Sequence, residues 1–222
     1  MSRFALLAST ATLLAFTSNA DPVLQKMRDQ TKDGPVYAYE MEYTATEVTA
    51  TGRVDPSKPE GSRIEVINPV EADWSEDFRE GLEEMESETD GDIWCADFAE
   101  TVPDNAQLVS GTDTTATYAF TPLPEEDADG IEKKLMKKIK GSITLDKQDG
   151  SILAFNMNLP KPYKPAMVAK INTFNMDAQC ARAPDGRTYV SSFNMAIAGS
   201  AMMQKFEENV SRRITKLLNP VQ

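Results

Sequence analysis

Two turn signals in the second half of the chain constrain its fold most. Lys147-Gln148-Asp149-Gly150 separates residues 142–146 from 151–159, and Ala183-Pro184-Asp185-Gly186-Arg187 separates residues 167–180 from 188–197. An Asp-Gly pair between two short alternating segments is the sequence signal of a β-hairpin. The second half of the chain therefore predicts a meander of antiparallel strands.

The first half mixes alternating and helical patterns. Along residues 36–54, Tyr37, Tyr39, Met41 and Tyr43 alternate with polar residues, which predicts one long strand with a buried face. A turn at 55–61 leads to a returning strand at 63–68. Further strands are expected at 106–110 and 115–121, and short helices near residues 22–27, 73–85, 93–98 and 131–139.

The C-terminal segment carries an apolar stripe. Met203, Phe206, Val210, Ile214 and Leu217 follow one another at spacings of three and four residues, which predicts a long C-terminal helix. A helix with one apolar stripe needs a surface to cover, and an antiparallel sheet with one apolar face provides it. We therefore expect a single α+β domain over residues 21–222. Its curved antiparallel sheet, a half-barrel or a helix-grip, would be covered by helices and wrapped around the C-terminal one.

The first twenty residues have the layout of a secretory signal peptide. Arg3 precedes an apolar run over residues 4–16, and the small residues Ser18 and Ala20 follow it. The run is shorter than the ~20 apolar residues that a membrane-spanning helix needs. The sequence predicts a periplasmic or secreted protein with no transmembrane anchor after cleavage.

Cys95 and Cys180 are the only cysteines. Because an exported chain meets oxidising conditions, we expect them to form one intramolecular disulfide. The alternative, a redox or nucleophilic pair, normally uses closely spaced cysteines beside a histidine or a helix start.

The absence of histidine excludes several function classes. It removes Ser-His-Asp and Cys-His catalysis and histidine-ligated zinc. The dispersed glycines form no phosphate-binding loop. The acidic turn at 125–130 lacks a calcium-loop pattern, because Met136 occupies the position of the bidentate carboxylate. We expect no metal, no cofactor and no enzymatic activity, and the net charge of -12 disfavours nucleic acid as a partner.

Methionines and aromatic residues provide the hint of a ligand cavity. Flexible thioether side chains suit varied apolar ligands, and they suit an irregular core equally well. The candidate cavity residues are Tyr37, Tyr39, Met41, Tyr43, Phe155, Met157, Phe193, Met195, Met203 and Phe206.

A basic run stands out in this acidic chain. Lys133, Lys134, Lys137, Lys138 and Lys140 form either a solvated helix face or a surface for an anionic headgroup or an acidic partner protein. The proline-rich segment 160–165 is expected to be a stiff connection between strands.

The order of the expected elements resembles a known family. A signal peptide, a short helix, a long hairpin over 37–68, helices inserted mid-chain, more antiparallel strands and a disulfide resemble the bacterial periplasmic lipoprotein-carrier half-barrel. That fold holds acyl chains under a helical cover. The predicted C-terminal helix is more similar to START-type helix-grip lipid-binding domains. Neither resemblance assigns a site residue.

Two functions from different classes follow. The first is a non-enzymatic exported binding or carrier protein for an apolar or amphipathic, lipid-like small molecule. The alternative is a cell-envelope structural or interaction protein whose acidic surface and basic helix engage an unknown protein partner.

Overall fold

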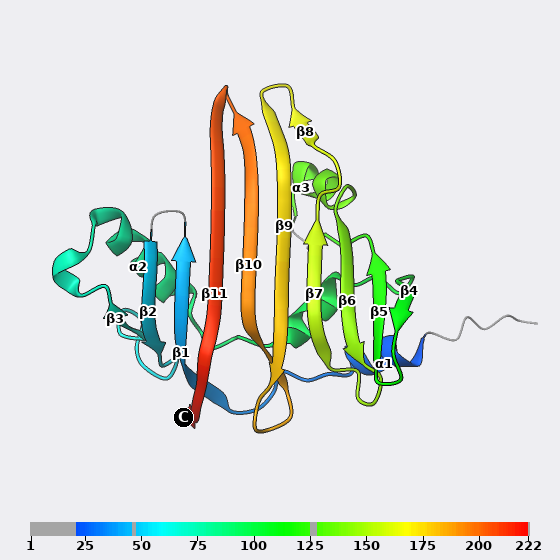
Figure 1. The fold of residues 1–222 in the computed structure, drawn as a ribbon, viewed down its shortest axis with the longest axis horizontal. Coiled ribbons are helices and arrows are strands. Elements are labelled where there is room, and N and C mark those ends of the chain that lie inside the picture. The colour runs from blue at the N-terminus through cyan, green and yellow to red at the C-terminus, as the bar shows by residue number, and fades with distance from the viewer. Residues whose placement is uncertain (1–20, 46–47, 125–127, 222) are drawn as a thin grey trace, which may run out of the picture.

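A computed structural model describes residues 21–45, 48–124 and 128–221. The predicted signal peptide and part of the acidic turn, residues 125–127, lie outside the described residues. The chain forms an antiparallel sheet with the strand order β3-β2-β1-β11-β10-β9-β7-β6-β5-β4, and β8 pairs with β9 (Figure 1). The strands are β1 (Val36–Ala45), β2 (Val48–Val54), β3 (Ile64–Asn68), β4 (Gln107–Gly111), β5 (Thr115–Phe120), β6 (Lys140–Asp146), β7 (Ile152–Asn158), β8 (Tyr163–Ala166), β9 (Ala169–Arg182), β10 (Thr188–Ala201) and β11 (Gln204–Val221).

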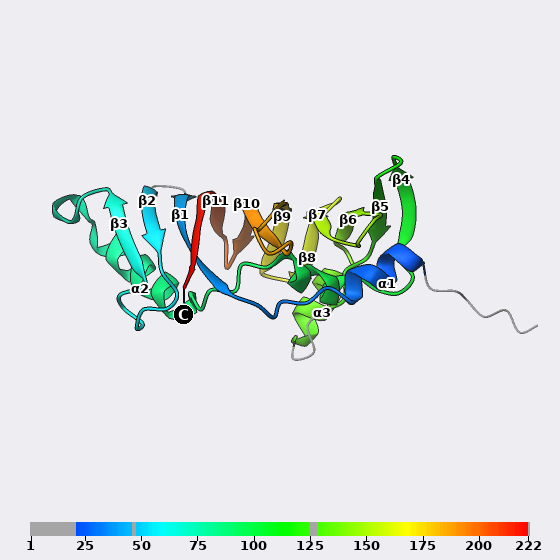
Figure 2. The same ribbon diagram turned by 90° about the horizontal axis from the view of Figure 1, so that it is seen from below.

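Helices cover one face of this sheet. Figure 2 shows the sheet from its end, with the helical segments on one side of it. These segments are α1 (Pro22–Arg28), η1 (Glu71–Asp73), α2 (Glu76–Glu88), η2 (Cys95–Thr101) and α3 (Gly130–Met136), where η denotes a 3-10 helix. We call this side the covered face and the opposite side the uncovered face. The expected α+β class with a helix-covered antiparallel sheet is confirmed, and the sheet is open, with β3 and β4 at its edges.

Two apolar clusters fill the covered face. The larger one surrounds Phe155, whose ring stacks on Phe98 of η2 at a centroid distance of 4.3 Å. The second gathers Tyr37, Tyr39 and Met41 of β1 around Trp94. The predicted disulfide is confirmed: Cys95 at the start of η2 is bonded to Cys180 of β9, with 6.4 Å between their Cα atoms. It ties the covering layer to the sheet covalently.

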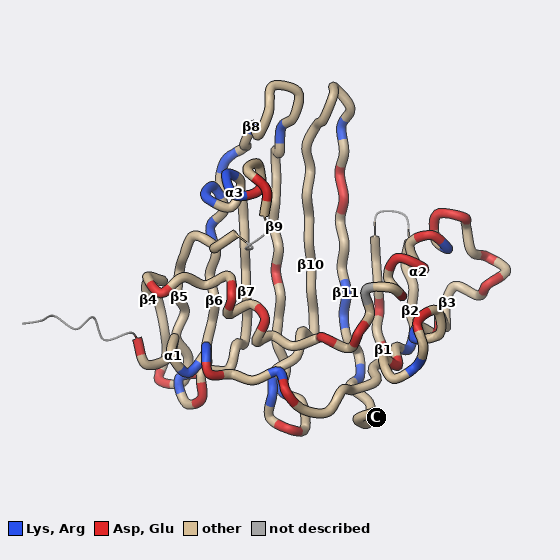
Figure 3. The backbone as a smooth tube through the Cα atoms, turned by 180° about the vertical axis from the view of Figure 1, so that it is seen from behind, with Lys and Arg blue, Asp and Glu red and all other residues tan. Residues whose placement is uncertain are grey.

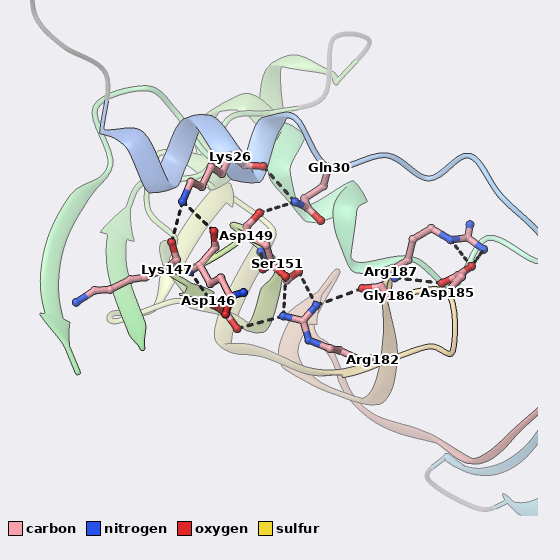
Figure 4. A network of polar contacts seen from close by, with 11 residues as sticks. Lys26, Gln30, Asp146, Lys147, Asp149, Ser151, Arg182, Asp185, Gly186 and Arg187 are labelled. Atoms are coloured by element: carbon pink, nitrogen blue, oxygen red, sulfur yellow. Dashed lines mark hydrogen bonds and ion pairs between the residues drawn. The ribbon is translucent and has the colours of Figure 1, made fainter. Parts of the chain in front are cut away.

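Helix α1 is held to the hairpin between β6 and β7 by polar contacts (Figure 4). The Lys26 ammonium donates to the carbonyl oxygens of Lys147 and Gln148 at 3.1 and 2.8 Å. Arg182 of β9 pairs with Asp149 in the same hairpin at 2.9 Å. Burial alone would raise the pKa of Asp149, but hydrogen bonds from Ser151 and Arg182 outweigh it and lower that pKa. The carboxylate therefore stays ionised and fixes the hairpin.

The predicted C-terminal helix is wrong, because residues 204–221 form strand β11. A spacing of four residues fits the helical period and is also a multiple of the strand period of two. Val210 and Ile214 consequently share one face of β11 with the charged Arg212 between them. An extra residue at Thr215 then bulges the strand and returns Leu217 to that face, beside Tyr39. No helix is wrapped by the sheet in the described residues, so the likeness to START-type domains loses its basis.

Three smaller expectations also differ from the structure. Residues 36–54 form the hairpin β1–β2 and not one strand; its turn, residues 46–47, lies outside the described residues. The sequence hides this turn because Thr44 to Thr49 contain no Gly, Pro, Asn or Asp. The proline-rich connection contains the short strand β8, and the helix expected near residues 93–98 is the 3-10 segment η2.

Candidate functional site

An apolar pocket of about 190 Å³ lies on the covered face between helix α2 and strands β1 to β3. The sheet provides its floor, because alternate residues of each strand point toward α2. Phe78, Leu82 and Met85 provide the opposite wall. The strand residues that line it are Met41, Tyr43, Ala45, Val48, Ala50, Thr51, Gly52, Ile64 and Val66.

Local sequence explains why α2 forms over this floor. Ser75 is the N-cap, and its hydroxyl accepts a hydrogen bond from the Phe78 amide at 3.1 Å. Acidic residues in the first turn, Glu76 and Asp77, favour the helix dipole. Spacings of four and three residues then place Phe78, Leu82 and Met85 in one stripe. That stripe is only half-buried, so α2 covers the sheet loosely.

One carboxylate anchors the C-terminal end of α2. Glu86 is only 6% exposed, and its oxygens accept hydrogen bonds from the amides of Gly61, Arg63 and Ile64 at 3.1, 3.0 and 2.6 Å. The Arg63 guanidinium donates in turn to the Thr89 carbonyl at 2.7 Å. Hydrogen bonds to a charged group are stronger than neutral ones, so this end of α2 is fixed to the start of β3.

The other end of α2 is held by one aromatic residue. The Trp74 indole donates to the Pro69 carbonyl at 2.9 Å, and its ring lies 5.3 Å from that of Phe78. The Arg79 guanidinium lies over the Trp74 ring at 5.2 Å. All these contacts join residues 69–79 to one another. Within the described residues, they therefore provide no hydrogen bond between the Phe78 end of α2 and a strand of the sheet.

The pocket is mainly apolar, and the exposed Asp77 of α2 is its one acidic lining residue. Burial raises the pKa of the Tyr43 phenol, which keeps it protonated and uncharged. An apolar cavity of about 150 Å³ is enough to bind benzene, so this pocket admits one ring or a short alkyl segment. No group of acidic, cysteine or histidine side chains that would hold a metal ion occurs in the part of the chain that the structure describes.

The ten predicted cavity residues do not lie together. Only Met41 and Tyr43 line the pocket. The remaining residues divide among three places: Tyr37 and Tyr39 are buried around Trp94; Phe155, Met157, Phe193 and Met195 lie on the covered face of the sheet centre; Met203 and Phe206 lie exposed at the far end of β11. The apolar stripe of α2 was visible in the sequence, but its partner strands were not.

A second hollow, of about 780 Å³, lies over the centre of the sheet, and the predicted cavity residues Met157 and Met195 are among the residues that line it. Six aligned residues of six neighbouring strands form a polar row in it: Ser142, Asn156, Asp177, Asn194, Ser211 and Thr44. The Ser211 hydroxyl donates to the Asn194 side-chain oxygen at 2.8 Å within this row. Asn156 and Asn158, which alternate with apolar residues in β7, were the sequence signal for this surface.

Comparison of the chain with known protein families, with curated proteins and with solved structures gave no match. Within the described residues, no helix combines the length and apolar character that crossing a bilayer requires.

Proposed function

We propose that this protein is an exported, non-enzymatic binding or carrier protein for an apolar or amphipathic, lipid-like ligand. The apolar end of the ligand enters the pocket beneath α2. The observation that carries the proposal is this pocket, whose walls are apolar side chains of the sheet on one side and of a half-buried helix on the other.

The way in which α2 is attached supports a ligand larger than the pocket itself. Sites for small molecules are commonly cavities of about 300–1,000 Å³. Displacing the Phe78 end of α2 about the Glu86 anchor enlarges the pocket and breaks no hydrogen bond between strands. The disulfide agrees with export.

A fluorescent fatty acid tests this function. cis-Parinaric acid becomes fluorescent in apolar surroundings, and we expect saturable binding with one site per chain. Ala50→Phe places a ring inside the pocket, since Ala50 is buried on the covered face opposite Tyr43. We expect this variant to bind at least about 10-fold more weakly, the loss that 1.4 kcal/mol produces.

The matched control is Ala154→Phe. Ala154 lies in β7 opposite Gln179 and Thr144, on the uncovered face, so the same added ring leaves the pocket unchanged. Equal binding by wild type, A50F and A154F, or no binding by wild type, would refute the assignment of this pocket.

Strand β4 favours a second function, interaction with another protein. All its residues are exposed, and the apolar side chains of Leu108 and Val109 are each 59% exposed. No described strand pairs with its outer edge, and such an edge accepts a strand from a partner chain. A photo-crosslinking amino acid at position 109 should trap one defined protein in intact cells, and a crosslinker at position 113 should not. Absence of any crosslink at position 109 would remove this function.

A further inference from the structure

The long hairpins of the sheet end in an exposed apolar tip. The turn between β8 and β9 and the turn between β10 and β11 lie side by side, joined by a hydrogen bond from the Met202 amide to the Val168 carbonyl at 2.9 Å (Figure 1). Met203 is 98% exposed, and Met167 is fully exposed. The tip consists of Met167, Val168, Met202 and Met203, and the partly exposed Phe206 lies behind it on β11.

This concentration of exposed apolar side chains is unusual for a chain of such charge. Single exposed apolar residues are normal on a protein surface, but a contiguous group marks a site of contact with a partner or a membrane. No Asp, Glu, Lys or Arg occurs from Thr188 to Gln204 or from Pro165 to Ala169, although the chain carries a net charge of -12.

The backbone φ angles at the tip are unusual for the residues that adopt them. Met202 and Met203 adopt φ angles of 49° and 69°, in the left-handed region that glycine and asparagine favour. A two-residue hairpin turn with two such angles normally contains Asn-Gly. Long apolar side chains at both positions therefore cost stability, and the turn itself gives no reason for them.

Lysines form a collar just behind the tip. Lys170 of β9 and Lys205 of β11 both lie opposite Ser200 of β10, so the two side chains share one row across three strands. This row lies about 7 Å from Met203 at the rise of a β-strand. Lys164 precedes the same tip on β8, and Figure 3 shows further basic residues of α3 at this end of the molecule.

We propose that the tip docks the protein on an anionic lipid bilayer. The methionines and Val168 enter the boundary between headgroups and acyl chains, and Lys164, Lys170 and Lys205 contact the anionic headgroups. Interfacial apolar groups enter this boundary by about 5–10 Å, which agrees with the distance of the lysine row behind Met203.

The charge distribution favours a bilayer in spite of the net negative charge. The next carboxylate along β11, that of Glu207, lies four residues from Met203, or about 13 Å away. Lys164, Lys170 and Lys205 therefore lie nearer to the headgroups than this carboxylate, which is about 7 Å behind Lys205, so their attraction outweighs its repulsion. The proposal does not depend on the pocket beneath α2.

Co-sedimentation with vesicles tests the tip. We expect the wild-type protein to pellet with vesicles containing 30% phosphatidylglycerol in phosphatidylcholine and to stay in the supernatant with pure phosphatidylcholine. The double variant Met202→Asn/Met203→Asn should bind at least about 10-fold more weakly, because it removes two apolar side chains from the boundary. Asparagine suits the φ angles of this turn, so the unfolding temperature should not fall.

A second pair of variants tests the collar. K170Q/K205Q should bind about 30-fold more weakly to anionic vesicles, since each lysine near such a surface contributes about five-fold. Lys216 lies on the same strand β11 at its opposite end, and K216Q should bind within two-fold of wild type.

Two control variants distinguish membrane binding through the tip from binding through other apolar surfaces. L108N/V109N makes the same kind of change on β4 and should pellet like wild type. A50F should also pellet, even where it loses parinaric acid, so that failure of the pocket and failure of the tip are distinguishable. Two results would overturn the proposal: wild-type protein that does not pellet with anionic vesicles, or M202N/M203N that pellets as wild type does.

Discussion

The contribution of the disulfide to the free energy of unfolding can be predicted from the length of the loop that it closes. Cys95 and Cys180 are separated by 85 positions, and the loop between them contains η2, α3 and strands β4 to β8. Loop-closure entropy for such a separation gives a stabilisation of about 4.6 kcal/mol at 25 °C. Replacing both residues, C95A/C180A, should lower the free energy of unfolding by about that amount and the unfolding temperature by about 9–18 °C.

Urea unfolding followed by tryptophan fluorescence measures this loss. Trp94 is buried directly beside Cys95, so its emission reports the attachment of η2 to the sheet. In this entropic account, the cross-link acts on the unfolded chain and not on the native structure. Removing it should expand the unfolded state and increase the dependence of stability on urea concentration. Wild-type protein in reductant is the matched control, because it keeps both sulfur atoms.

Two results would contradict this reasoning. A loss below about 2 kcal/mol would mean that the unfolded chain is already compact without the cross-link. A large loss with unchanged urea dependence would mean that the disulfide acts on the native packing of η2 and not on the unfolded chain.

Three further changes test the packing and the electrostatics. Phe155→Ala should lower the free energy of unfolding by about 3–5 kcal/mol, measured in urea, because the ring is fully buried. Arg187→Lys should shift the emission of Trp94 and lower stability by about 2 kcal/mol, since a lysine cannot reproduce the planar stacking at 3.5 Å; an unchanged spectrum would refute this stacking. Burial alone would raise the pKa of Asp185, but hydrogen bonds from Arg187 and its positive charge lower it. The ionised carboxylate therefore contributes stability above its unfolded pKa of about 4, and this is lost as the pH falls through the lower folded value. Acid titration should show less pH dependence in D185N than in wild type, and equal dependence would contradict the pairing.

Local signals in the sequence predicted the hairpins of the second half correctly. Asp149-Gly150 and Asp185-Gly186 mark their turns, where both glycines adopt positive φ angles. The disulfide was equally predictable, because two cysteines in a chain that is expected to be exported leave one pairing. The hairpins depend on residues that are close in sequence, and the disulfide has only one possible pairing.

Features that depend on distant pairing were not predictable. The stripe through Val210 and Ile214 fits a helix and a strand equally, and only pairing with β1 and β10 decides for the strand. The Met202–Met203 turn carries no residue typical of a turn, so its sequence does not indicate the hairpin between β10 and β11. The pocket was missed for a different reason: strands β1 to β3 precede α2 directly along the chain, but the sequence does not show which part of the sheet the stripe of Phe78 covers.

The position of β11 also determines when the fold can be completed. Among the described strands it alone links the β1–β3 block to the rest of the sheet, through β1 on one side and β10 on the other. The earliest strands of the chain must therefore wait, with an unpaired edge, until residues 204–221 have been synthesised. The β1–β3 block and the strands from β4 to β10 can each form hairpins early, and the last residues of the described chain join the two parts into one sheet.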